Sequence, residues 1–103
     1  MDEPMTEPGS WTELRERRMS ETGAAAAYRA AQLAHELGAA VRSRREQRQL
    51  SQSRLARTAG MTQSAVARFE AGGAIPTVPV LDRLAEALDA DLVVQVVPRT
   101  RPD

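Results

Sequence analysis

Three polar side chains, Gln63, Ser64 and Arg68, are of types that hydrogen-bond to the edges of DNA bases. A glutamine amide can bond at two points to adenine, a serine hydroxyl accepts several bases, and an arginine favours guanine. Their spacing places them on the side of a helix opposite Val66 and Phe69. On an isolated helix such residues are ordinary solvated positions, so their role depends on the elements around them.

Two short helices joined by a tight turn are predicted at this place. Ser51 can cap a helix over residues 52–59, and Gly60 ends it. Thr62 can cap a second helix over residues 63–71, which stops before two glycines. Two helices of about two turns each, joined by a short turn that contains glycine, have the layout of a helix-turn-helix.

The preceding segment has the apolar spacing of a helix. Leu33, Ala34, Leu37 and Val41 form its stripe, and the segment from 24 to 48 is either one long helix or two helices that meet near Gly38.

Further upstream, Ser10 and Glu13 have the spacing of a capping box, which predicts a short helix from Trp11 to about Met19 that Gly23 terminates.

Two elements are predicted after the motif. Thr77 caps a helix with Pro79 in its first turn, and its buried stripe follows. That stripe consists of Val80, Leu81, Leu84 and Leu88. Residues 91–97 are rich in β-branched side chains and predict a strand, with Leu92, Val94 and Val96 on one face. Because the chain offers no second strand, we expect this one to pair with the same strand of another copy in a homodimer.

The expected fold is therefore all-α with one C-terminal β-strand. We divide the chain into an acidic, flexible N-terminal segment with a short helix (1–22), a helical domain (23–90), a dimerisation strand (91–98) and a tail (99–103).

Charge is unevenly distributed along this neutral chain, in which 14 arginines balance 14 acids. Residues 1–22 and residues 69–103 each carry six acids and three arginines, whereas residues 23–68 carry eight arginines and two acids. A basic block between two acidic ends suits a protein whose middle meets phosphates.

Composition argues against an enzyme. The chain has no cysteine and a single histidine, His35, so we expect no disulfide, metal site, cofactor or catalytic residue. The longest apolar run is far too short to cross a bilayer, and no secretion signal is visible, so we expect a cytoplasmic protein without a membrane partner.

The segment from Leu50 to Gly72 resembles the helix-turn-helix of the phage-repressor (Cro/C1, Xre) family. It shares L-S-Q-x-x-L-A, a turn glycine, and T-Q-S-x-V-x-R-x-E-x-G, and the resemblance extends over residues 36–90. It implies a lambda-repressor-like helical bundle in which the second helix of the motif enters the major groove.

The resemblance implies roles for individual residues. Gln63, Ser64 and Arg68 would contact bases, and Gln52 would brace Gln63. Phosphate contacts are expected from Gln52, Ser51, Arg42, Arg44 and Arg54. A buried ion pair between Arg45 and Glu70 would join the motif to the preceding helix.

The chain also resembles small antitoxins of the HigA kind, through its N-terminal extension, single motif and closing strand. Such antitoxins bind a RelE/HigB-like ribonuclease toxin and repress their own operon. Trp11, Leu14 and Met19 are then candidates for toxin binding, because tryptophan is frequent at interface centres and an acidic segment complements a basic, RNA-binding partner. The alternative is that Trp11 packs the segment onto its own domain.

The sequence thus predicts a homodimeric, sequence-specific repressor of a palindromic operator in double-stranded DNA, most specifically an antitoxin. Two alternatives remain open: a free-standing regulator without a toxin, and a protein-interaction module that does not bind DNA.

Overall fold

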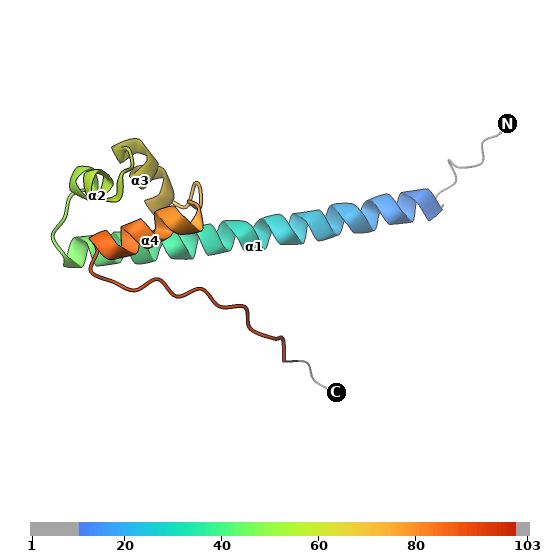
Figure 1. Cartoon of the computed structure of the whole chain (residues 1–103). Helices are drawn as coiled ribbons and strands as arrows, with labels where there is room; N and C mark the ends of the chain where they lie inside the picture. Colours follow the sequence, from blue (N-terminus) through green and yellow to red (C-terminus); the bar gives the residue numbers. More distant parts are fainter. Residues whose placement is uncertain (1–10, 101–103) are drawn as a thin grey trace.

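The computed structural model describes residues 11–100, without the side chains of residues 18–20. It contains four helices in that range: α1 (Trp11–Gln47), α2 (Gln52–Ala59), α3 (Gln63–Glu70) and α4 (Val78–Ala87). The three short helices gather around the C-terminal end of α1, and the rest of α1 extends away from them (Figure 1). The expected helical bundle is present.

The long helix α1 differs from the prediction. Gly23 does not end a short N-terminal helix, because α1 runs without a break through Gly23 and Gly38. A single glycine costs a helix only about 1 kcal/mol relative to alanine, and the four alanines that follow Gly23 are the best helix formers. The proposed boundary at residue 22 therefore falls inside a continuous helix.

The two helices of the motif begin as predicted, and α2 also ends as predicted, whereas α3 ends at Glu70, one residue before the predicted end. The Ser51 hydroxyl accepts from the backbone N–H of Arg54 at 3.0 Å, and the Thr62 hydroxyl accepts from Ala65 at 3.1 Å. Gly60 ends α2 in the left-handed conformation, with a φ of 71°, which a residue without a Cβ adopts at little cost. These caps fix both the length of each helix and the turn between them.

The core forms where α2, α3 and α4 meet, against the end of α1. Its buried members are Leu55, Ala56, Ala59, Val66, Phe69, Leu81, Leu84 and Leu88. From α1, Leu37 and Val41 pack against this cluster and Ala34 is buried. Leu33, predicted to share that stripe, is instead 51% exposed, because it lies just beyond the part of α1 that the domain covers.

Residues 11–33, which we call the projecting part of α1, contain no buried residue among those whose side chains are described. The chain's radius of gyration is 20.6 Å, whereas about 13 Å is typical of a compact domain of this length.

The C-terminal segment also leaves the domain (Figure 1). Within the described residues, 91–97 form no strand. A strand that pairs with another copy cannot form in a single chain, so this part of the prediction is not confirmed.

Gly38 marks the closest approach between α1 and α3. A Cβ at this position would collide with the carbonyl oxygen of Phe69, so the two helices can pack this closely only with glycine here. Gly23 has the same helical backbone but nothing within 4 Å of such a Cβ.

We therefore expect Gly38→Ala to destabilise the fold by about 2 kcal/mol or more, because rigid backbone atoms must separate. Gly23→Ala is the matched control, and it should leave the unfolding midpoint unchanged or raise it while increasing helical circular dichroism. Urea unfolding of both variants measures the difference. Equal stability of the two variants would contradict the close approach.

Candidate nucleic-acid interface

The exposed side of α3 carries the three candidate base-reading residues. Gln63, Ser64 and Arg68 are all exposed, whereas Val66 and Phe69 on the opposite side are buried. Burial of this apolar side against α1 and α2 fixes which side of α3 faces outward. The structure thus brings the three polar residues together on one free surface, as the base-contact prediction requires.

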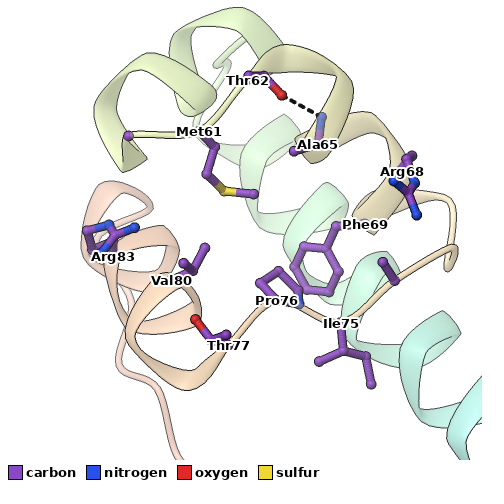
Figure 2. Close-up of a pocket in the computed structure, with 12 residues that line it drawn as sticks. Met61, Thr62, Ala65, Arg68, Phe69, Ile75, Pro76, Thr77, Val80 and Arg83 are labelled. Carbon is purple, nitrogen blue, oxygen red and sulfur yellow. Dashed lines mark hydrogen bonds between the residues drawn. The ribbon is translucent and has the colours of Figure 1, made fainter.

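The N-terminal end of α3 is held firmly at this surface. Figure 2 shows the Thr62 hydroxyl meeting the backbone nitrogen of Ala65, at the point where α3 begins. Arg68 lies on the same helix in this view, where it is exposed and also lines a cavity. A helix anchored at its first turn, with an exposed cation, has the form of a helix that enters a groove of DNA.

Arginines on α2 add positive charge beside α3. Arg54 and Arg57 are exposed, and within the described residues neither they nor Arg68 forms an ion pair. Ser51 is exposed at the start of α2, where its hydroxyl retains a proton to donate. These positions suit phosphate contacts, as predicted for Ser51 and Arg54.

Arg44 has a different role from the one predicted. Its Nε donates to the carbonyl oxygen of Leu88 at 3.0 Å, and its Nη2 donates to that of Asp89 at 2.9 Å. These carbonyls end α4, where helix oxygens lack partners within the helix. Arg44 therefore ties α4 to α1, and we no longer assign it to phosphate binding.

Arg42 lies two positions before Arg44 on α1 and is exposed to solvent. Its Nε is 3.4 Å from Glu46 in an exposed ion pair, which leaves it free to exchange that partner for a phosphate.

A buried ion pair joins α1 to α3, between the two residues that the family resemblance implied. Arg45 Nε donates to Glu70 Oε2 at 2.7 Å, and Arg45 Nη2 donates to Glu70 Oε1 at 3.0 Å. The Glu70 side chain is 3% exposed. The hydrogen bonding of Arg45 to the Glu70 carboxylate raises the pKa of Arg45 above its ordinary value, so Arg45 stays charged.

The same carboxylate also binds α2. Gln52 Nε2 donates to Glu70 Oε1 at 3.1 Å, so one acid connects α1, α2 and α3. In this structure the Gln52 amide nitrogen donates to Glu70, and among the described residues no hydrogen bond joins Gln52 to Gln63. The phosphate contact of Gln52 stays a prediction. Ser53 braces Gln63 instead, since its hydroxyl donates to Gln63 Oε1 at 2.9 Å.

A shallow cavity of about 360 Å³ lies behind α3, between the turn of the motif and α4. Met61, Phe69, Pro76 and Val80 supply much of its wall (Figure 2). The residues that line it include no acid, histidine or cysteine. The sequence did not indicate this cavity, because its wall comes from a loop and three separate elements.

The candidate toxin-binding residues lie at the far end of α1. Trp11 is 66% exposed, with the Arg15 guanidinium 5.7 Å from its ring centre. Leu14 is half-buried. The side chain of Met19 lies outside the described residues. Trp11 is the first residue of α1 and is largely exposed, so its side chain is not packed onto the domain in this structure.

The predicted dimer-strand residues are also accessible. Val94 is exposed, Val96 is 98% exposed and Leu92 is half-buried against the core.

No described helix is long and apolar enough to span a membrane. Within residues 11–100, no three metal-ligating side chains gather at one place.

Comparison with known proteins agrees with this geometry. The profile of the Helix-turn-helix domain family matches residues 36–95. Among solved structures, the clp gene regulator ClgR from Corynebacterium glutamicum is similar, with 27% sequence identity and a TM-score of 0.57. The match covers 57% of this chain and 63% of ClgR, so the chain spans less than two thirds of that relative. The search of curated proteins found no match.

The buried ion pair between Arg45 and Glu70 should contribute to the stability of the fold. Arg45→Ala leaves the Glu70 carboxylate buried without its cation, and we expect a loss of about 3–5 kcal/mol in the free energy of unfolding. Arg42→Ala removes a solvent-exposed pair from the same helix and should cost no more than about 0.5 kcal/mol. Denaturant unfolding of both variants tests this, and similar losses would refute a structural role for Arg45.

Proposed function

The chain belongs to the Helix-turn-helix domain family, and we propose that it is a sequence-specific transcriptional repressor that acts as a homodimer on DNA. The observation that carries this proposal is the exposed side of α3. It presents Gln63, Ser64 and Arg68 beside the exposed arginines of α2, while its other side is locked into the core. The similarity to a gene regulator supports the same conclusion.

Each residue group has a distinct task in this complex. Gln63, Ser64 and Arg68 read base edges in the major groove and so set the sequence preference. Ser51, Arg42 and Arg54 bind phosphates, which supply affinity and orientation without sequence information. Because phosphate binding releases counterions, affinity should fall steeply as salt rises.

The dimer places two copies of α3 in successive major grooves about 34 Å apart, so the operator is a palindrome. We assign dimerisation to residues 91–97. Their exposed valines leave apolar surface that the same segment of a second copy would cover, and pairing of two such segments would satisfy backbone groups that one chain leaves open.

The most specific form of the proposal is an antitoxin that also represses its own operon. The projecting part of α1 supports it, because an isolated helix with an exposed tryptophan at its tip gains little from its own domain. A RelE/HigB-like ribonuclease would be basic around its RNA-binding site, and Trp11, Leu14 and Met19 would provide its anchor. A free-standing regulator, or an interaction module without DNA binding, is the outcome if the tests below fail.

For DNA binding, we expect Arg68→Ala to cost about 1–3 kcal/mol and to relax preference at one base pair. Arg54→Ala should weaken all duplexes alike and reduce the salt slope by about 1. Arg29→Ala removes an equal charge from the projecting part of α1 and should change neither. Titration of the DNA upstream of the protein's own reading frame, at several salt concentrations, measures all three. If the wild-type chain bound none of these duplexes, the protein-interaction module without DNA binding would be the remaining candidate function.

For toxin binding, we expect a small basic reading frame beside this one, whose product is toxic alone and harmless when coexpressed. Trp11→Ala should weaken that complex by at least about 2 kcal/mol, as interface anchors do. Tyr28→Ala, an equally exposed aromatic on the same helix, is the matched control. Calorimetry with the purified partner gives both affinities.

Removal of residues 1–22 should abolish rescue from toxicity while leaving DNA binding intact, because the domain packs only from Ala34 onward. If rescue survives, the toxin binds elsewhere. If the neighbouring product is harmless, the chain is a free-standing regulator.

A further inference from the structure

A hydrogen bond between the two helices of the motif holds the first residue of α3. Ser53 lies in the first turn of α2, and its Oγ donates to Gln63 Oε1 at 2.9 Å. Both residues are exposed on the side of the domain that carries the candidate base contacts. The bond therefore lies where DNA would approach, and not within the core.

Gln52, the neighbour of Ser53, cannot do this in the same arrangement. Its Nε2 donates to Glu70 Oε1, and Glu70 is itself bound through two hydrogen bonds by Arg45. This cluster is nearly dry, since the Glu70 and Arg45 side chains are 3% and 12% exposed. Turning Gln52 toward Gln63 would remove a hydrogen bond from a buried carboxylate, which is costly.

In this structure the Ser53 hydroxyl donates to the amide oxygen of Gln63, so the side chain is held with that oxygen toward α2. A glutamine oxygen has two lone pairs, and its nitrogen has two donors. With one lone pair bound to Ser53, the second lone pair and both donors remain for DNA. An acceptor beside a donor is the pattern that complements the N6 and N7 edge of adenine.

Without Ser53, the Gln63 amide loses the hydrogen bond that holds its oxygen toward α2, and the side chain rotates more freely. The Gln63 side chain would then lose more rotational freedom when it binds, and a flipped amide would meet adenine with its donors against donors. The preference for adenine would weaken even though Gln63 itself is unchanged.

We propose that Ser53 is a positioning residue that orients Gln63 for the recognition of adenine at the base pair facing the start of α3. This inference rests on the proposed function, because it assumes that α3 reads DNA. It assigns to α2 a share of the sequence preference that is separate from phosphate binding.

The test measures base preference and not affinity alone. The full chain is titrated with four duplexes that carry the operator found upstream of its own reading frame. These duplexes differ only at the base pair that faces Gln63. We expect the wild type to prefer adenine, and Ser53→Ala to reduce that preference about threefold to tenfold. Ser53→Thr keeps the hydroxyl and should restore it.

Two further variants separate positioning from general damage. Thr58→Ala removes another hydroxyl from α2, one that bonds only to the carbonyl oxygen of Arg54, and it should leave base preference unchanged. In a Gln63→Ala background, Ser53→Ala should have no additional effect, because its target is gone.

Three results would overturn the proposal. Ser53→Ala could leave the adenine preference intact, it could weaken all four duplexes equally, or it could act as strongly without Gln63 as with it. In each case the wild type still binds its operator, so the proposed function stands. If the wild type binds no duplex at all, the proposed function fails and this inference fails with it.

Discussion

The contact between Arg45 and Glu70 determines how the motif is mounted on the rest of the chain. The carboxylate comes from the last residue of α3, the guanidinium comes from α1, and Gln52 of α2 donates to the same carboxylate. A nearly dry carboxylate must be neutralised and hydrogen-bonded, and the packing of α1, α2 and α3 seen here meets both needs. The pair holds α3 against α1, so it helps to set which side of α3, with Gln63 and Arg68, faces outward.

Glycine at position 38 is the steric counterpart of that electrostatic contact. The helix α1 can approach the carbonyl of Phe69 closely because Gly38 has no side chain, and this approach lets Arg45, two turns further along α1, reach Glu70. Arg44 and Arg83 extend the same principle to α4. Each donates to a carbonyl at the end of a neighbouring helix, Arg44 to Leu88 and Arg83 to Ala59. Thus Arg44 and Arg45 of the basic block, together with Arg83, serve the fold.

Sequence patterns predicted the local features well because those features depend on neighbouring residues. Ser51, Gly60 and Thr62 define helix ends through contacts within a few residues, and Val66 and Phe69 follow from helical spacing. The predictions that failed depended on the relative size of opposing free-energy terms, which a sequence pattern does not measure. Gly23 was assigned as a helix end, but the cost of one glycine is small beside the helix preference of the alanines that follow.

The site was harder to predict than the helices for a related reason. Arg42, Arg44 and Arg45 lie within four positions on one helix, and only the packed structure decides which faces solvent, which caps α4 and which binds Glu70. Likewise Ser53 and Gln52 are adjacent, and either could reach Gln63 by spacing alone. The buried Glu70 carboxylate accepts a hydrogen bond from Gln52 in addition to those from Arg45. Ser53 is then the partner of Gln63.

Because some arginines hold the fold together and others face solvent, the basic block of residues 23–68 needs a different interpretation. The eight arginines of residues 23–68 do not form one uniform phosphate-binding surface, because Arg44 and Arg45 are tied inside the domain and Arg48 lies 3.7 Å from Asp89. The positive charge that remains free beside α3 comes from Arg54, Arg57 and Arg68, which sit on the two helices of the motif. In the proposed DNA complex, a small, localised positive surface on a neutral chain would give weak general attraction, so base contacts would have to supply a larger share of the binding free energy. Selectivity in such a protein then depends on how firmly residues such as Gln63 are oriented before DNA arrives.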